Sequence, residues 1–246
     1  MKGKFQHALV IGASSGIGAA LVRRLVSEGC RVAALARRED QLKALAQSSD
    51  GDRIIIRRHD VTQTEEIPSL FQDIARELGG LDLVIYAAGV MHPMAFEEFN
   101  TDKDLEMIRT NLEGAIAWLN PAAERFGSLG RGCIVGIGSV AGDRGRSGNP
   151  AYGTSKAALH TYLEALRNRV ARSGVRVVTI KPGFVDTPMI AGLSGLFWLI
   201  SPDKAARIIL SKAARGVNTA YVPARWRLVM AIIRRIPSFI FRHLKV

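Results

Sequence analysis

The stretch Gly12-Ala13-Ser14-Ser15-Gly16-Ile17-Gly18 directly follows the apolar run Ala8–Ile11 and leads into a helical pattern. Glycines at a strand-to-helix turn let the backbone bend sharply and approach a pyrophosphate, whose charge the helix N-terminal N–H groups can meet. A glycine triplet alone is weak evidence, but this one opens a helix at the start of a βαβ unit. The sequence therefore predicts a dinucleotide-binding turn, although its G-x-x-x-G-x-G spacing differs from the common G-x-G-x-x-G.

Apolar runs and segments of helical periodicity alternate along the first 180 residues, as in a parallel sheet covered by helices. Most of these runs are continuous, which is expected of strands buried on both faces. The predicted strands are Ala8–Ile11, Arg31–Ala36, Arg53–Arg57, Leu81–Tyr86, Gly132–Ile137, Val175–Ile180 and a short seventh at Tyr221–Pro223. The predicted helices are Ile17–Glu28, Glu39–Gln47, Pro68–Glu77, Asp104–Arg125 and Tyr152–Arg172. We therefore predict a single α/β domain with a doubly wound, parallel, seven-stranded sheet and helices on both faces.

The composition is that of one globular domain. Of the 246 residues, 48% are hydrophobic and 23% are charged, so no long segment has the composition of a disordered chain. Apolar stretches such as Leu228–Ile233 are far shorter than the roughly 20 residues that span a bilayer, and the N-terminal run ends too early for a signal peptide. Cys30 and Cys133 belong to no Cys/His cluster, so we expect neither a disulfide nor a metal site, and we expect a cytoplasmic setting.

Two arginines follow the second predicted strand, where a dinucleotide fold selects its cofactor. Arg37 and Arg38 come 19 and 20 residues after Gly18, where an acidic residue would hold the ribose hydroxyls of NAD. Arginine instead favours the 2′-phosphate of NADP; two exposed arginines starting the next helix are the alternative. Asp60-Val61 and Ala88-Gly89, which follow the third and fourth strands, are weaker candidates, because an Asp after a strand is more often a helix cap.

Tyr152 and Lys156 lie four positions apart at the start of a long predicted helix and face the same side of it. A phenol with an ordinary pKa of about 10 is a poor proton donor and acceptor at neutral pH, and a nearby ammonium would lower that pKa. Ser139 follows a strand and would face the same crevice, where its hydroxyl could bond a substrate oxygen. Asn111 lies in mid-helix, which is unfavourable unless its amide has a partner; a solvent-facing amide is the alternative.

Together these residues resemble the short-chain dehydrogenase/reductase family over roughly residues 5–190. The matching positions are the glycine motif at 12–18, Asp60, Asn111, Ser139, Tyr152, Lys156 and the segment Lys181–Thr187. The resemblance implies a Rossmann-type fold without a metal. It also implies that Tyr152 is the catalytic acid/base, that Lys156 lowers its pKa and holds the nicotinamide ribose, that Ser139 positions the carbonyl oxygen, and that Asn111 supports a proton-relay water.

The same resemblance predicts the cofactor-binding residues and an assembly. The predicted contacts are Gly12, Ser14, Ser15, Gly16, Ile17, Gly18, Arg37, Arg38, Asp60, Val61, Ala88, Gly89, Tyr152, Lys156, Pro182, Gly183, Val185 and Thr187. The family implies a homodimer or homotetramer assembled through the helices that carry Asn111 and Tyr152. Two departures concern the scaffold: Ile11 replaces the usual Thr, and Tyr86-Ala87-Ala88-Gly89 replaces N-N-A-G, so an amide hydrogen bond between neighbouring loops is missing.

Beyond the predicted core at residues 1–190, residues 189–215 are the expected substrate lid. Hinge-forming glycines and a large apolar cluster, Leu196–Ile200, suggest a mobile cover over an apolar substrate. Packing into a subunit interface is an equally weighted alternative.

Residues 224–246 form a basic amphipathic tail. From Arg225 to Val246 the chain has five Arg, one Lys and no acid, which is half of the net charge of +12. Trp226, Val229, Met230 and Ile233 form an apolar stripe at helical spacing. Such a segment can lie in an anionic membrane interface, and packing on the protein itself or on a sister subunit is the alternative.

The sequence thus predicts an NADP(H)-dependent oxidoreductase that interconverts a carbonyl and an alcohol by hydride transfer, on an apolar or acyl-chain substrate. The alternative is a non-catalytic dinucleotide-binding or regulatory protein, which would have no need of the full set of Asn111, Ser139, Tyr152 and Lys156. No nucleic-acid partner is expected, because no recognised binding module is present. The expected location is the cytoplasm, and the tail adds peripheral contact with the inner face of a membrane as an open alternative.

Overall fold

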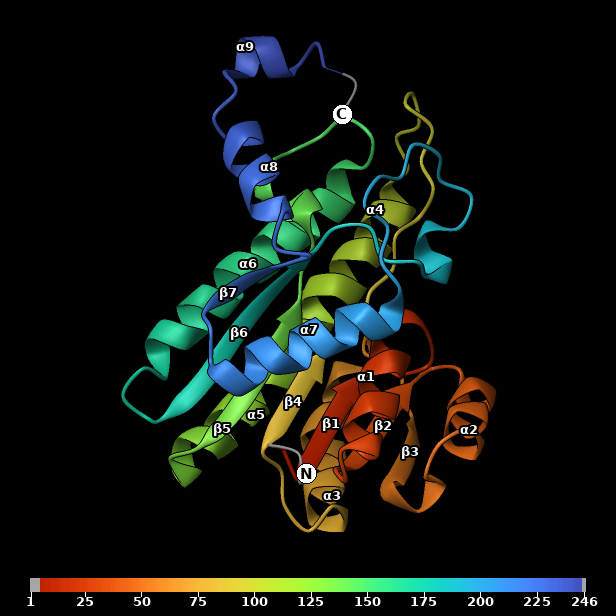
Figure 1. Cartoon of the computed structure of the whole chain (residues 1–246), viewed down its shortest axis with the longest axis vertical. Coiled ribbons are helices and arrows are strands. Elements are labelled where there is room, and N and C mark those ends of the chain that lie inside the picture. The colour runs from red at the N-terminus through yellow and green to blue at the C-terminus, as the bar shows by residue number, and fades with distance from the viewer. Residues whose placement is uncertain (1–4, 245–246) are drawn as a thin grey trace.

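Seven parallel strands form one twisted sheet in the computed structural model, which describes residues 5–244 (Figure 1). The spatial order is β3-β2-β1-β4-β5-β6-β7, so the direction of strand addition reverses between β1 and β4. The strands are β1 (His7–Ile11), β2 (Arg31–Ala36), β3 (Ile54–Arg58), β4 (Leu83–Tyr86), β5 (Gly132–Ile137), β6 (Val175–Pro182) and β7 (Thr219–Val222). Every pairing is parallel, which confirms the predicted doubly wound sheet.

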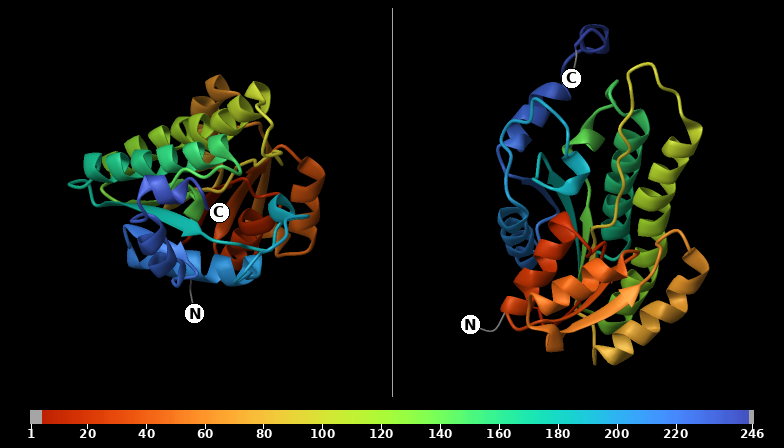
Figure 2. Two further views of the ribbon diagram at one scale, coloured as in Figure 1. Left: turned by 90° about the horizontal axis from the view of Figure 1, so that it is seen from above. Right: turned by 90° about the vertical axis from the view of Figure 1, so that its right-hand side faces the viewer.

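Helices cover both faces of the sheet (Figure 2). The face with α1 (Gly16–Ser27), α2 (Glu39–Gln47) and α7 (Pro202–Arg215) packs against one apolar cluster, and the face with α3 (Ile67–Glu77), α5 (Gly114–Leu129) and α6 (Pro150–Arg169) against a second. Along β1, Ala8 and Val10 enter the first cluster while Leu9 and Ile11 enter the second. Successive side chains of a strand point to opposite faces of the sheet. A strand therefore needs a continuous apolar run to place apolar side chains in both clusters.

The prediction of one continuous helix at Asp104–Arg125 is wrong. The segment is divided into α4 (Thr101–Ile108), a π-helical turn at Arg109–Glu113, and α5. The π turn contains Asn111, whose amide bonds to backbone atoms outside the helix, as described below. Helix α6 begins at Pro150, two residues before the predicted start, because the Asn149 carboxamide oxygen accepts the Tyr152 N–H at 3.1 Å and caps the helix.

The tail begins as a packed element of the fold. Helix α8 (Trp226–Ile233) buries Trp226 and Met230 against Val140, so this half of the tail packs on the protein itself. Helix α9 (Ser238–Phe241) follows and lies at one extreme of the long axis of the molecule (Figure 1). Lys245 and Val246, the end of the predicted tail, lie outside the described residues. Within residues 5–244, no helix combines the length and apolarity needed to cross a membrane.

The turn after β1 lies against the loop after β4. Gly12 has a φ of +90°, and a Cβ added to it would come within 2.4 Å of the Ala88 backbone nitrogen. Backbone cannot retreat as a flexible side chain would, so only glycine permits this approach.

We predict that Gly12→Ala lowers the free energy of unfolding more than Gly29→Ala does. The two glycines have nearly equal φ, +90° and +89°, but a Cβ on Gly29 would meet nothing within 4 Å. Gly29→Ala should therefore cost only the backbone strain of about 1–2 kcal/mol, whereas Gly12→Ala adds an overpacking cost of about 1–3 kcal/mol. Urea unfolding of both variants measures the difference, and equal losses of stability would contradict the close approach.

Candidate active site

One cavity of about 430 Å³ opens at the carboxyl edge of the sheet, beside the reversal between β1 and β4. Ligands of open α/β sheets bind at such a reversal. Of the predicted site residues, Asp60 and Asn111 are the two that do not line it. Those that do are Gly12, Ser14, Ser15, Gly16, Ile17, Gly18, Arg37, Arg38, Val61, Ala88, Gly89, Ser139, Tyr152, Lys156, Pro182, Gly183, Val185 and Thr187.

The glycine turn forms one wall of the cavity as a compact backbone cradle. A Cβ on Gly18 would lie 2.0 Å from the Gly12 carbonyl oxygen, so a side chain cannot be accommodated there. Ser15 is the N-cap residue of α1 but makes no side-chain capping bond, and the first turn of α1 holds no acidic residue. The N–H groups of that turn therefore face the cavity without a protein carboxylate, as an anion site at a helix N-terminus requires.

The two arginines after β2 differ in their partners. The Arg38 guanidinium donates to the Ser14 hydroxyl at 2.9 Å and to the Ser15 hydroxyl at 2.8 Å, which holds it beside the glycine turn. Arg37 instead pairs with the Asp60 carboxylate at 3.6 Å, and Asp60 also accepts the Thr62 N–H at 3.0 Å. Among residues 5–244, no carboxylate pairs with Arg38, whereas the charge of Arg37 is partly compensated by Asp60.

Ser139, Tyr152 and Lys156 meet at the opposite wall. Ser139 follows β5 and accepts the Ala141 N–H at 3.1 Å, while Tyr152 and Lys156 lie one helical turn apart on α6. The Lys156 ammonium donates to the Ile137 carbonyl at 3.1 Å and lies 5.7 Å from the centre of the Tyr152 ring. The Tyr152 hydroxyl reaches Met189 Sδ at 4.0 Å, so its oxygen faces the start of the predicted lid.

Burial controls the protonation of this pair. Lys156 is 4% exposed, and desolvation lowers its pKa to about 8. Desolvation also raises the pKa of Tyr152, and the hydrogen bond with the Ser139 side chain opposes that rise. The expected lowering of the Tyr152 pKa by Lys156 is therefore not found in the chain alone, because desolvation has the largest effect on this phenol.

Asn111 supports the site from behind. Its amide nitrogen donates to the Val90 carbonyl and to the Ser155 hydroxyl, both at 3.0 Å, and its oxygen accepts the Val90 N–H at 2.8 Å. Asn111 is completely buried, so the solvent-facing alternative is excluded. A Cβ on Gly89 would lie 3.1 Å from Asn111 Oδ1 and 3.3 Å from Lys156 Nζ, so the glycine lets the loop after β4 lie against both side chains.

Tyr86 supplies a contact that the sequence did not indicate. Its buried hydroxyl donates to the Thr110 carbonyl at 2.5 Å and ties β4 to the π turn that carries Asn111. Gly114 makes room for this phenol, since a Cβ there would lie 2.7 Å from the Tyr86 oxygen. This hydrogen bond holds β4 to a neighbouring segment in a chain that lacks the amide of the N-N-A-G pattern.

A second unforeseen group is a buried polar network behind Ser139. Asp143, whose side chain is 1% exposed, accepts from Lys181 at 2.5 Å and from the Tyr221 hydroxyl at 2.6 Å. Desolvation and then the Lys181 charge lower the pKa of His160 to about 3, so its ring is neutral and can accept the Ser139 N–H at 3.4 Å. Asp143, Lys181 and Tyr221 come from three separate segments, so no local sequence pattern reveals the network.

We predict that the contribution of Lys156 to the free energy of unfolding, measured as the difference between the native protein and Lys156→Met, rises with pH. Its pKa is about 8 in the folded chain against an ordinary 10.5, so between these values the unfolded chain holds a proton that the folded chain lacks. Between pH 8 and pH 10 the gain should be about 2 kcal/mol, and Lys156→Met should lack it. Urea unfolding of both proteins at each pH measures it; an equal pH dependence in both would contradict the assignment.

Comparisons with known proteins agree with this geometry. The family model described as short chain dehydrogenase matches residues 6–194. An uncharacterised oxidoreductase of Myxococcus xanthus is 38% identical over 189 residues, covering 76% of this chain and 75% of that protein. One of Staphylococcus aureus is 33% identical over 184 residues, covering 75% and 80%.

Two solved structures share the fold. A crystal structure of an actinorhodin polyketide ketoreductase with NADPH has a TM-score of 0.78 and 27% identity, covering 89% of this chain and 95% of that one. The structure of ElxO with NADP bound has a TM-score of 0.79 and 22% identity, covering 90% and 99%. The matched family model spans the cavity and both of its walls, and the chain belongs to the short-chain dehydrogenase family of oxidoreductases.

Proposed function

We propose that this cavity is the active site of an NADP(H)-dependent reductase that interconverts a carbonyl and an alcohol. The observation that carries the proposal is that Ser139, Tyr152 and Lys156 lie across one cavity from the glycine cradle and Arg38. The ketoreductase structure with NADPH, at 27% identity, supports the same cofactor and reaction class.

Arg38 is the residue proposed to select NADP(H). The Ser14 and Ser15 hydroxyls orient its guanidinium, and no carboxylate competes for it among the described contacts. A planar, pre-oriented guanidinium suits a phosphate monoester, whereas ribose hydroxyls call for an acidic acceptor. Arg37 would contribute less, because the Asp60 carboxylate already neutralises part of its charge.

The reduced nicotinamide, when bound, supplies the hydride. The chain supplies the proton and the orientation. Burial keeps the Tyr152 phenol protonated at neutral pH, so its O–H can donate to a carbonyl oxygen as that oxygen gains negative charge. The Ser139 hydroxyl would donate a second hydrogen bond to the same oxygen. Proton transfer leaves a phenolate on Tyr152, which favours the ammonium form of Lys156 one helical turn away.

The substrate end of the cavity is apolar. Pro188, Met189 and Ile190 line it from the segment after β6, and Val90 and Met91 line it from the loop after β4. These side chains offer burial and few polar contacts, which favours an apolar or acyl-chain carbonyl substrate. Residues 191–199 continue this segment in an irregular, largely exposed path, which supports a role as a cover over that substrate.

We predict that Tyr152→Phe lowers turnover about 10²- to 10⁴-fold, because it removes the proton donor and little else. Its dissociation constant for NADPH should stay within about twofold, because the glycine cradle, Arg38 and Lys156 would still line the cofactor's part of the cavity. Tyr162→Phe is the matched control: it lies on the same helix, with its hydroxyl bonded to Asn120 rather than facing the cavity. Steady-state NADPH oxidation with a carbonyl panel tests both; full activity in Tyr152→Phe would refute the mechanism.

Arg38→Ala should weaken NADPH binding roughly 10- to 100-fold, the cost of about 1.5–3 kcal/mol for one charge-assisted phosphate contact. NADH binding should change little, and Arg37→Ala should have the smaller effect because its partner is Asp60. Fluorescence titration with both cofactors gives the two ratios. A native preference for NADH, or an equal loss of both cofactors in Arg38→Ala, would contradict this assignment.

A further inference from the structure

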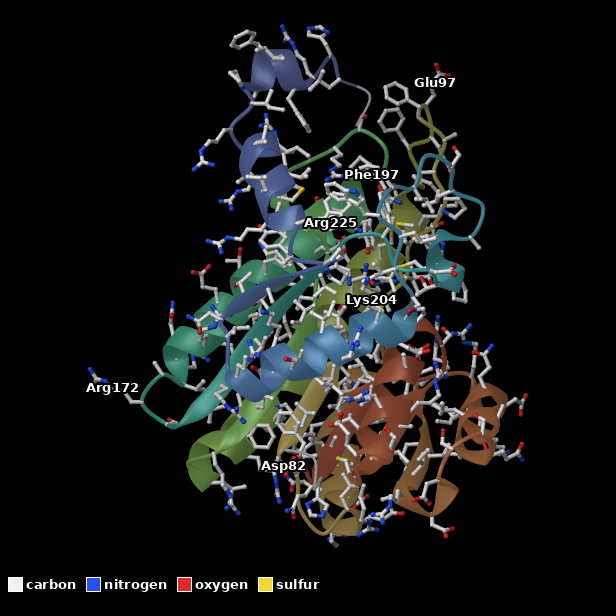
Figure 3. All side chains as sticks on the ribbon, viewed as in Figure 1. Asp82, Glu97, Arg172, Phe197, Lys204 and Arg225 are labelled. Atoms are coloured by element: carbon white, nitrogen blue, oxygen red, sulfur yellow. The ribbon has the colours of Figure 1, made fainter. Side chains whose placement is uncertain are left out.

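Exposed apolar side chains gather at one end of the molecule. Within the described residues, fourteen large hydrophobic side chains are exposed, and all except Leu129 belong to the segments 96–105, 189–199 and 228–244. Figure 3 places Phe197 and Arg225 toward this end and Asp82 and Arg172 away from it. The exposed apolar side chains are therefore concentrated at the end of the molecule that carries the cavity. A random distribution over the surface would not give this concentration.

Helix α8 contributes two different faces. Its inner face buries Trp226 and Met230, while Leu228 and Ile232 on its outer face are 71% and 60% exposed. Trp226, Val229, Met230 and Ile233 therefore pack on the protein, whereas Leu228 and Ile232 do not. Leu228 and Ile232 remain exposed, as do Phe239 and Ile240 of α9.

Arg144 forms hydrogen bonds with the end of α8 and with the residues that follow it. Its guanidinium donates to the Ile233 carbonyl at 2.8 Å and to the Ile236 carbonyl at 2.5 Å, and it lies 4.0 Å from the centre of the Phe241 ring. Helices α8 and α9 are thus held in place by contacts with the core of the fold.

An aromatic cluster joins the predicted lid to the same helix. Phe197 and Trp198 lie with ring centres 5.1 Å and 5.7 Å from that of Trp226, and the Arg225 guanidinium lies 4.6 Å from the centre of the Trp198 ring. The lid and the tail therefore form one continuous surface, here called the end face. Its exposed apolar residues are Leu193, Phe197, Trp198, Leu199, Leu228, Ile232, Phe239, Ile240 and Leu244.

The charges that the tail brings to the end face have one sign, whereas Glu97, next to the exposed Phe96, lies at the same end of the molecule (Figure 3). Arg225, Arg227, Arg234, Arg235 and Arg242 are exposed, and residues 225–246 contain no acid. A second copy of the same face would repel these charges, whereas an anionic surface would attract them. Aromatic and large aliphatic side chains bordered by arginines match the interface of an anionic bilayer, where the rings enter the headgroup region and the arginines meet the phosphates.

We propose that the end face docks the protein onto an anionic phospholipid bilayer, with the cavity opening beside the lipid. Met189 links the two features, because it lines the cavity, lies 4.0 Å from the Tyr152 hydroxyl and is 38% exposed. An apolar substrate dissolved in the bilayer would then reach the cavity along the lid. This route, unlike the docking itself, rests on the proposed function.

Co-sedimentation tests the docking. The full chain should bind phosphatidylglycerol-containing vesicles at low salt, bind pure phosphatidylcholine vesicles much more weakly, and lose binding as salt rises. Arg227→Glu with Arg235→Glu should weaken binding at least tenfold, since each basic residue contributes about 1 kcal/mol near such a surface. The control variant, Arg169→Glu with Arg172→Glu, makes the same change of charge away from the end face. It should change vesicle binding little. Phe239→Ser should also weaken binding, and its control Leu129→Ser should not.

Absence of binding to anionic vesicles at low salt would overturn the proposal, as would equal losses in the two arginine pairs. Self-association in analytical ultracentrifugation that Phe239→Ser abolishes, without vesicle binding, would assign the face to a second copy instead.

Activity separates the substrate route from the proposed function. With NADPH, Arg227→Glu with Arg235→Glu should reduce turnover of a long-chain ketone in anionic vesicles and leave turnover of a short soluble ketone unchanged. Equal turnover of the vesicle-borne ketone would contradict the route. If the native protein reduced neither ketone, the proposed function would be contradicted. The docking proposal would still be tested separately by vesicle binding.

Discussion

The approach of the Gly12 turn to the Ala88 backbone is the constraint on which the site depends. It occurs where the strand order reverses between β1 and β4. The loops that follow these two strands touch at Gly12 and Ala88 and then lead to opposite sides of the sheet order. The cavity opens there because parallel strands present all their carboxyl ends at one edge. One wall then carries the glycine cradle and the arginines, and the other carries the side chains of β5 and α6. A bulkier residue at position 12 would separate the two walls.

Burial gives this site its chemistry as well as its shape. Removing Lys156 from water brings its pKa down to about 8, and removing Tyr152 from water moves its pKa up. The result at neutral pH is a protonated phenol next to a lysine that is close to its titration point. In the proposed reaction, the protonated phenol is the group that would give a proton to a carbonyl oxygen. Asn111 bonds to Val90 in the loop after β4, and Tyr86 bonds to Thr110 in the π turn that carries Asn111.

Local patterns in the sequence were sufficient for the parallel sheet, the glycine turn and the Tyr152–Lys156 pair, because each depends on residues close together in the chain. The π turn at Arg109–Glu113 was not predictable, since it depends on bonds between Asn111 and Val90. The Asp143 network likewise joins segments far apart in the sequence. The sequence shows that the tail is amphipathic, but it does not show which surface its apolar side covers. The structure shows that Trp226 packs in one cluster with Val140. The residue roles and the oligomeric assembly stay predictions.

The central claim is that the two walls of this cavity bring a hydride donor and a proton donor to one carbonyl group. Transfer of deuterium to a ketone from NADPH that carries deuterium at both positions of nicotinamide C4, followed by mass spectrometry of the alcohol, tests it most directly. The account predicts one deuterium on the carbinol carbon of the product, with the hydroxyl proton coming from solvent by way of Tyr152. Alcohol formed without the label, or no alcohol from any carbonyl compound in the presence of bound NADPH, would contradict it.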